Sequence, residues 1–225
     1  MAIGLKIPGF GGWSDDPLWG HFYDWTVEHP NVGGAIWKVG IGSDLAQLYK
    51  AAAEIGTLAP GSTVLDVPCG GGVALRGLKP EQGVRYVAAD ISELMLKRTA
   101  EAARERGVDD QVEPTITDVH NMQFEDGEFN LVVSFTGLHC FPDPHRAVLE
   151  MGRVTRAGGA LTGSTLIKDS LRSRPIHAVG QAAGLLGPGL YERDIHAWMA
   201  EAGFDDVVVN VSGLMAYFRG VRGHS

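Results

Sequence analysis

Short apolar runs alternate with longer amphipathic stretches along most of the chain. The apolar runs, typical of strands, lie at about 63–66, 85–90, 112–117, 129–134 and 160–166. The stretches with helical spacing lie at about 44–57, 92–106, 145–154 and 191–202. Strands that alternate with helices in this way form a mainly parallel sheet with helices on both faces. The pattern therefore predicts a doubly wound α/β fold.

The chain before residue 59 has a different pattern, with many aromatic residues. Asp16–Pro17 is typical of a helix N-cap followed by proline at the first helical position. Four of the five tryptophans lie in this part of the chain. We therefore divide the chain into an N-terminal helical and aromatic segment, 1–58, and a main domain, 59–225. The N-terminal segment either packs on the main domain as a helical cap or covers a substrate, with Trp19 and Tyr23 as the expected lid residues.

Two later stretches complete the pattern. Residues 167–190 interrupt the alternation with arginine, proline, histidine and glycine, and they form either an inserted cap over the site or a surface connection. Two further apolar runs, at about 206–210 and 214–219, flank Ser212–Gly213 and are interpreted as a pair of strands.

The first apolar run leads through Asp66 into three consecutive glycines, Gly70–Gly72. Glycines lack Cβ, so the backbone can approach a ligand closely. A dinucleotide site would need a third glycine where Leu75 stands, and the Asp66 carboxylate would repel a pyrophosphate. At an effective dielectric constant of about 20, two unit charges about 4 Å apart interact by roughly 4 kcal/mol, which is enough to select ligand charge. S-adenosylmethionine fits better, because it carries an ammonium and a sulfonium and no phosphate.

The sequence of this loop resembles the first motif of class I S-adenosylmethionine-dependent methyltransferases. That motif is acid-x-Gly-x-Gly-x-Gly, and here Asp66, Pro68, Gly70 and Gly72 occupy its four positions. Proline replaces the first glycine and has no N–H, so any cofactor contact through that group is lost.

Downstream segments are similar to those of the ubiquinone/menaquinone-biosynthesis C-methyltransferase-like group. They lie at 117–124, 129–134 and 138–143, with Cys140 replacing the second histidine of a Leu-His-His-Phe-x-Asp segment. The resemblance covers roughly residues 45–166. It implies a Rossmann-like methyltransferase fold with a seven-stranded sheet that ends in an antiparallel C-terminal hairpin.

Acidic and polar residues stand at or near the ends of the predicted strands, where ligands of doubly wound sheets bind. Asp90 has the spacing of an acid that accepts from ribose hydroxyls. The resemblance implies that Asp118 accepts from the adenine amino group and that the Val119 N–H donates to the adenine ring. The expected cofactor-binding residues are Asp66, Pro68, Cys69, Gly70, Gly72, Asp90, Ile91, Asp118, Val119 and Ser134.

Methyl transfer from a sulfonium is an in-line displacement, so the protein mainly orients the acceptor and, for some acceptors, removes a proton. His139 follows the fourth strand and is the candidate general base, since the ordinary pKa of histidine lies near neutrality. The alternative is that His139 only hydrogen-bonds its loop. No cluster has metal-ligand spacing.

Composition and charge limit the classes of partner that the chain is expected to bind. The 225 residues are 44% hydrophobic with a net charge of −8, and no basic stripe indicates nucleic-acid binding. We find no apolar run long enough to span a bilayer and no signal peptide. Two cysteines do not make a disulfide framework, which favours the cytoplasm. The pattern favours no particular oligomeric state.

The sequence thus predicts a methyltransferase for a small apolar or aromatic molecule or lipid. Two other classes stay open. A non-catalytic S-adenosylmethionine-binding or accessory protein is kept open by Pro68 and Cys140, which depart from the family pattern. Leu75 and Asp66 count against an NAD(P)-dependent oxidoreductase.

Overall fold

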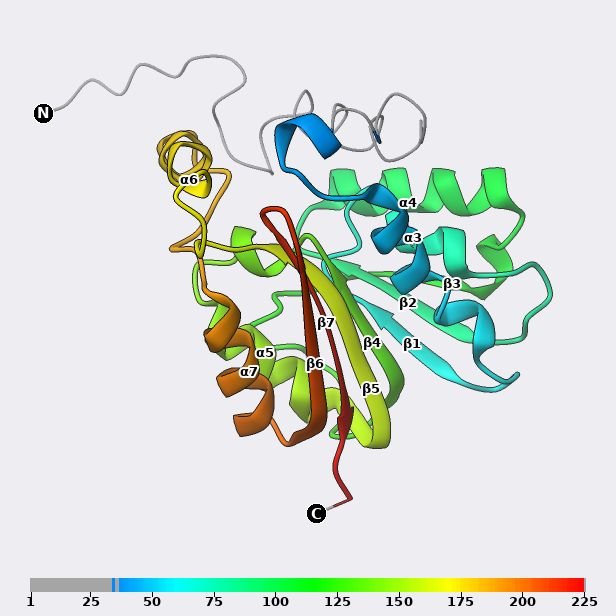
Figure 1. The fold of residues 1–225 in the computed structure, drawn as a ribbon. Coiled ribbons are helices and arrows are strands. Elements are labelled where there is room, and N and C mark those ends of the chain that lie inside the picture. Colours follow the sequence, from blue (N-terminus) through cyan, green and yellow to red (C-terminus); the bar gives the residue numbers. More distant parts are fainter. Residues whose placement is uncertain (1–33, 35–36, 225) are drawn as a thin grey trace, which may run out of the picture.

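The computed structural model describes residue 34 and residues 37–224 (Figure 1). The predicted N-terminal helix, with Trp19 and Tyr23, lies outside the described residues. Trp37 is described, and its side chain is buried in an apolar cluster together with residues of the main domain. This one aromatic residue of the N-terminal segment therefore packs on the domain.

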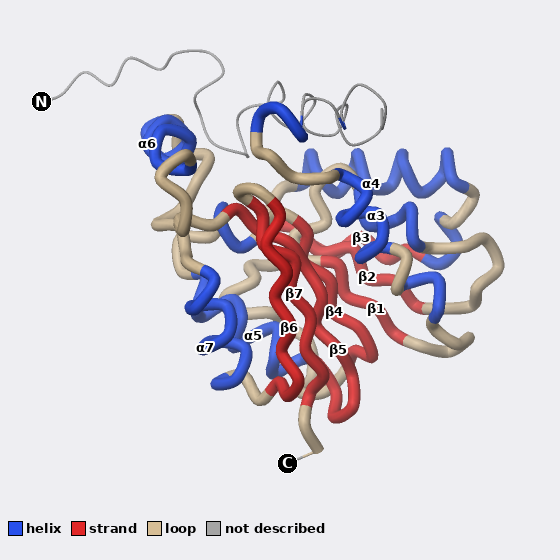
Figure 2. The backbone as a smooth tube through the Cα atoms, viewed as in Figure 1, coloured by secondary structure: helices blue, strands red, loops and turns tan. Residues whose placement is uncertain are grey.

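A seven-stranded sheet forms the centre of the molecule, in the order β3-β2-β1-β4-β5-β7-β6 (Figure 2). The strands are β1 Thr63–Asp66, β2 Arg85–Asp90, β3 Val112–Ile116, β4 Phe129–Phe135, β5 Thr155–Leu166, β6 Phe204–Ser212 and β7 Met215–Arg222. Strands β1 to β5 pair in parallel, and β7 runs antiparallel to both of its neighbours. The predicted doubly wound sheet with an antiparallel C-terminal hairpin is confirmed.

Helices cover both faces of the sheet (Figure 1). The α-helices are α3 Leu45–Ala52, α4 Glu93–Arg106, α5 Pro144–Val154, α6 Ser173–Ala182 and α7 Glu192–Glu201. Short 3-10 helices are η1 Ile55–Thr57, η2 Val73–Gly77, η3 Asp109–Gln111 and η4 Leu138–Cys140. One apolar cluster joins the sheet to α3 and α4, and a second joins the other face to α5 and α7. The central strands are apolar on both faces because both faces are covered.

Local sequence signals set the ends of the main helices. The Ser92 hydroxyl accepts from the Met95 N–H at the start of α4, and Gly107 ends that helix in the left-handed conformation, with φ +66°. Asp143 caps α5 and is followed by Pro144 at the first helical position. These two helices begin and end close to where the sequence predicts.

The fifth strand differs from its prediction. It begins at Thr155 and not near residue 160, so Gly158–Gly159 lies inside β5. The pairing of β4 with β5 shifts register between Phe129 and Leu131, and Gly158 has φ +72°. A glycine that adopts positive φ lets the strand accommodate this irregularity without ending.

The stretch predicted as one helix at 44–57 is split into α3 and η1. Two glycines bring this region against η2, which follows the glycine loop as a 3-10 turn. A Cβ on Gly56 would lie 2.8 Å from the carbonyl oxygen of Gly77, and a Cβ on Gly77 would clash with the carbonyl of Ala52. The backbones therefore approach more closely than side chains would permit.

Helix α6 lies within the interruption at 167–190, on the side of the carboxyl ends of the parallel strands (Figure 1). The Gly187 N–H donates to the His139 carbonyl at 2.8 Å, and the Lys168 N–H donates to the Leu190 carbonyl at 2.9 Å. These bonds tie the insert to η4 and close its base. A cap over the site and a surface connection both agree with this position, so the cap stays a prediction.

None of the helices in the described part of the chain is long and apolar enough to cross a membrane.

Candidate functional site

The strand order reverses between β1 and β4, which is where doubly wound sheets bind ligands. A cavity of about 270 Å³ lies at this point. Its walls come from the glycine loop after β1, the carboxyl ends of β2 and β3, and the segment after β4. The lining residues include Asp66, Pro68, Cys69, Gly70, Asp90, Ile91, Asp118 and Val119, all named as cofactor-binding by the sequence. Gly72, Ser134 and His139 are not among the lining residues.

The two motif glycines serve different contacts. Gly70 has φ +52°, and a Cβ built on it would meet no atom within 4 Å, so its open side faces the cavity that it lines. Gly72 has φ +86°, and its Cβ would lie 3.0 Å from the Leu75 side chain and 3.3 Å from that of Ala102. Gly72 therefore lets the loop pack closely on α4.

Asp90 holds the glycine loop from the end of β2. Its Oδ2 accepts from the Gly70 N–H at 3.1 Å, and its Oδ1 accepts from the Ser92 N–H at 2.9 Å. Burial raises the pKa of Asp90, and these backbone N–H groups act in the opposite direction. Two backbone N–H groups thus fix the orientation of the Asp90 carboxylate.

Thr99 holds the same glycine from the other side. Its hydroxyl on α4 donates to the Gly70 carbonyl at 2.7 Å, so the peptide groups flanking Gly70 are fixed at both their N–H and their C=O. Thr99 was not predicted as a site residue. The signal in the sequence was a threonine at helical spacing from Leu96 and Ala103, with which it shares the buried face of α4.

Asp66 is almost fully buried at the end of β1, with 1% of its surface exposed. The Tyr86 hydroxyl donates to its Oδ2 at 2.7 Å. Burial raises the pKa of Asp66 to about 7; the hydrogen bond from Tyr86 opposes this rise, and the charge of Asp90 adds to it. The sequence predicts a carboxylate that is simply charged, whereas the structure has one that titrates near neutrality. A cation bound next to it would favour the ionised form.

Asp118 follows β3 and is bound by its own loop. Its Oδ1 accepts from the His120 N–H at 2.9 Å and lies 2.6 Å from His120 Nδ1. The His120 backbone N–H is the main cause that lowers the pKa of Asp118. His120 also lines the cavity, and its Nε2 is buried without a hydrogen-bond partner among the described residues.

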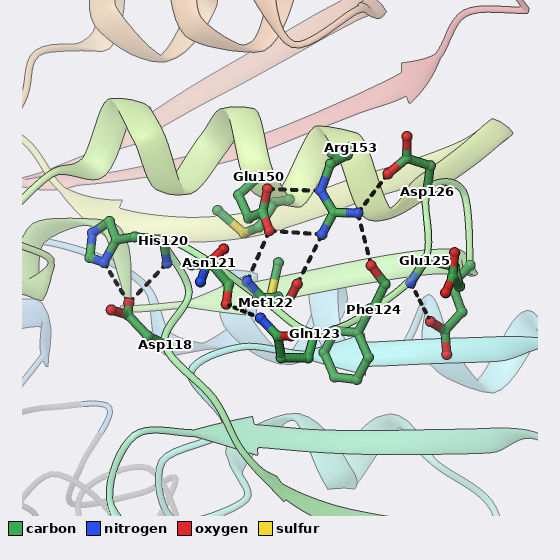
Figure 3. Close-up of polar contacts among 12 residues, drawn as sticks. Asp118, His120, Asn121, Met122, Gln123, Phe124, Glu125, Asp126, Glu150 and Arg153 are labelled. Carbon is green, nitrogen blue, oxygen red and sulfur yellow. Dashed lines mark hydrogen bonds and ion pairs between the residues drawn. The ribbon is translucent and has the colours of Figure 1, made fainter.

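Arg153 on α5 anchors the loop that carries Asp118 (Figure 3). Its guanidinium donates to the carbonyls of Met122 and Phe124 at 3.0 and 2.8 Å and to the Asp126 carboxylate at 2.6 Å. It also donates twice to Glu150, and Glu150 accepts from the Met122 N–H at 2.9 Å. The planar, five-donor arginine head can bind several backbone carbonyls and carboxylates at once. The loop after β3 is therefore attached to a helix on the opposite side of the sheet from α4.

The segment after β4 packs directly on the glycine loop. A Cβ on Gly137 would lie 2.4 Å from Pro68 Cδ and 2.8 Å from Ser134 Oγ, so only glycine fits there. Ser134 is fully buried, and its Oγ has no hydrogen-bond partner among the described residues. Thr136 lines the cavity with φ +55°, a strained conformation for threonine that is found mainly at functional sites. The sequence did not single out Thr136.

His139 lies in η4, and its ring is buried behind the cavity wall. Its Nδ1 accepts from the Leu166 N–H at 3.1 Å and lies 3.1 Å from the Thr165 hydroxyl. Burial lowers the pKa of His139 to about 3, with a smaller contribution from His177. These contacts are the ones expected of a histidine that hydrogen-bonds its surroundings, and the general-base role stays a prediction.

The described residues hold no group of three or more histidine, cysteine, aspartate or glutamate side chains that could bind a metal ion.

A family model described as a methyltransferase domain matches residues 65–162. A ubiquinone/menaquinone biosynthesis C-methyltransferase from Hydrogenovibrio crunogenus is 31% identical over 118 residues, covering 51% of this chain and 46% of that protein. A sarcosine/dimethylglycine N-methyltransferase from Halorhodospira halochloris is 34% identical over 102 residues, covering 45% of this chain and 37% of that protein. The chain spans less than half the length of these curated relatives.

Solved structures share the fold. A geranyl diphosphate methyltransferase crystallised with geranyl diphosphate and sinefungin has a TM-score of 0.65 at 18% identity, covering 80% of this chain and 77% of that one. The [4+2]-cyclase SpnF has a TM-score of 0.66 at 18% identity, covering 81% and 83%. The domain match covers β1 through the middle of β5, which includes the three aspartates of the cavity. Residues 65–162 thus match a methyltransferase domain, and the fold is that of solved methyltransferases, in agreement with the family that the motifs resemble.

Proposed function

We propose that the chain binds S-adenosylmethionine in this cavity and transfers its methyl group to a small molecule. The observation that carries the proposal is the charge of the lining. Asp66, Asp90 and Asp118 come from three adjacent strand ends, and the cavity lining includes neither lysine nor arginine among the described residues. Such a site attracts a cationic nucleoside and repels the phosphates of a nicotinamide dinucleotide.

Each part of the cofactor has a candidate partner. Asp66 would bind the ammonium group, and Asp90 would accept from the ribose hydroxyls. Each carboxylate oxygen can accept two hydrogen bonds, so Asp90 can bind a ribose while it still holds Gly70. Asp118 and the backbone of Val119 would bind the adenine. The open side of Gly70 leaves room for the cofactor to approach the loop backbone.

When bound, S-adenosylmethionine supplies a methyl group on a sulfonium that is already activated for displacement. The chain's own residues would orient the acceptor and exclude water from it. The wall contributed by the end of β4 and the segment after it is mostly apolar, with Phe135, Phe141 and Pro142. Pockets of this kind suit apolar or aromatic molecules and lipids.

The relatives' printed acceptors are of a different kind. Sarcosine and geranyl diphosphate both carry an anionic group, which calls for a basic side chain in the acceptor site. The described lining offers none, which supports an uncharged acceptor for this chain. His139 remains the candidate base on its position after β4, although a conjugate acid with a pKa of about 3 makes it a weak one.

The second candidate function is that the chain binds the same cofactor but either catalyses nothing or catalyses a reaction other than methyl transfer. The fold of SpnF, a cyclase by its title, is similar to this one at a TM-score of 0.66. A fold shared with a cyclase does not fix methyl transfer.

Calorimetry with S-adenosylmethionine and S-adenosylhomocysteine tests binding, and radiolabelled methyl transfer to a metabolite extract tests turnover. Asp110→Asn, an exposed change on η3, is the control for the site variants. Binding with label transferred to a small molecule supports the proposal. Binding without any labelled product supports the second function, and no binding refutes both.

A further inference from the structure

A tyrosine hydroxyl lies inside the apolar core beneath the cavity. Tyr86 stands on β2 opposite Val64 of β1, and its side chain is fully buried in the cluster that joins the sheet to α3 and α4. Its hydroxyl donates to Asp66 Oδ2 at 2.7 Å. A buried hydroxyl needs a partner, and here the partner is a carboxylate that lines the cavity.

The Asp66 carboxylate lies between this tyrosine and the cavity. Tyr86 is not among the lining residues, so it reaches the cavity only through Asp66. Asp90 at the end of β2 also acts on Asp66, and the charge of Asp66 in turn helps to raise the pKa of the Cys69 thiol in the glycine loop. On the other side, β4 places the apolar Val133 opposite Asp66. None of these neighbours is a cation.

We propose that Tyr86 is a positioning residue that acts through Asp66 and keeps its carboxylate ionised for the ammonium group of the cofactor. The inference rests on the proposed function. Among the described residues, Tyr86 supplies the one side-chain hydrogen bond that favours the charged form of Asp66, while burial and Asp90 disfavour it. A phenylalanine at this position would fill nearly the same space and leave Oδ2 buried without that donor.

The size of the effect follows from this balance. Losing a hydrogen bond to a charged group changes an ionisation equilibrium roughly 10- to 100-fold. Starting from a pKa of about 7 for Asp66, Tyr86→Phe should weaken cofactor binding about 3- to 25-fold at pH 7.5. At pH 9.5 Asp66 is largely ionised in both proteins, so their affinities should agree within about twofold.

The test is calorimetric titration of wild type and Tyr86→Phe with S-adenosylhomocysteine at pH 6.5, 7.5, 8.5 and 9.5. This ligand keeps the ammonium, and its own titration cancels in the ratio of the two dissociation constants. Tyr217→Phe is the matched control, because Tyr217 is also buried and its hydroxyl pairs with Ser43 at 3.0 Å. Thermal unfolding checks that both variants fold. Asp66→Asn should weaken binding at every pH, and adding Tyr86→Phe to it should change little.

The inference is supported if the ratio of the dissociation constants, variant over wild type, grows for Tyr86→Phe as the pH falls and does not change with pH for Tyr217→Phe. A Tyr86→Phe ratio that matches the control, or a loss of equal size at every pH, overturns it while the proposed function stands. If the wild type binds no S-adenosylhomocysteine at any pH, the proposed function and this inference fail together.

Discussion

Replacing Asp66 with asparagine should stabilise the ligand-free protein at neutral and alkaline pH. The pKa of Asp66 is raised from 3.8 to about 7 in the folded state, mainly by burial. The folded protein therefore holds this proton more tightly than the unfolded chain between about pH 4 and 7. Stability that is present below pH 4 is lost as the pH rises through that window. At 1.36 kcal/mol per pH unit, the loss over about three units reaches roughly 4 kcal/mol.

Asparagine does not titrate in this range, so the variant does not lose folding stability at this position as the pH rises. We expect the difference in unfolding free energy, variant minus wild type, to grow by about 3–4 kcal/mol between pH 4.5 and 8. Urea unfolding followed by tryptophan fluorescence at several pH values measures it. Groups common to both proteins cancel in the difference, and Asp110→Asn serves as the exposed control. A difference that does not change with pH would refute the assignment of a near-neutral pKa to Asp66.

Four other changes test the site and its supports. Asp90→Ala should weaken S-adenosylmethionine binding by more than about tenfold, since it removes a charged acceptor; unchanged affinity in calorimetry contradicts the ribose assignment. Thr99→Val should weaken binding by about fivefold in calorimetry and Thr99→Ser should restore it, because the hydroxyl is the group that donates to the Gly70 carbonyl. Arg153→Met should cost about 2 kcal/mol in urea unfolding, and a cost below about 0.5 would show that the loop is held otherwise. His139→Asn removes a buried histidine that must charge in acid. Its pKa is lowered from 6.5 to about 3, so wild-type stability rises with pH across that window. The free energy of unfolding of the variant minus that of wild type should therefore be about 3 kcal/mol larger at pH 4 than at pH 7.5. A difference of the same size at both pH values would contradict the lowered pKa.

The sequence predicts which acidic residues come together at the strand ends. Asp66, Asp90 and Asp118 each follow an apolar run, and parallel strands bring their carboxyl ends to one edge. The structure places all three around one cavity. A close backbone approach at the glycine loop could also be predicted. Three consecutive glycines after a strand are typical of a backbone that must approach a ligand or a neighbouring helix closely.

Contacts between distant residues could not be predicted. Tyr86 donates to Asp66 across a strand pair, and Thr99 donates to a glycine 29 positions away. Each depends on strand register and on the rotation of a helix, neither of which a single sequence fixes. The same holds for the contacts of Arg153 with the Met122 and Phe124 carbonyls, which depend on how α5 packs against the loop after β3.

The direction and surroundings of buried side chains were also beyond prediction from the sequence. The position of His139 after β4 suggests a base facing the acceptor, but its ring hydrogen-bonds the backbone of Leu166 and is buried away from the cavity lining. A residue's place along the chain does not fix the direction of its side chain in a short 3-10 helix. Gly158 shows the same limit, because glycine signals a turn and a strand irregularity equally well.

If the carboxylates at the strand ends bind a cationic nucleoside, the wild-type chain should distinguish S-adenosylmethionine from NADH in calorimetry under the same conditions. We expect one binding event with micromolar affinity for S-adenosylmethionine and no heat with NADH. Heat with NADH and none with S-adenosylmethionine would contradict it.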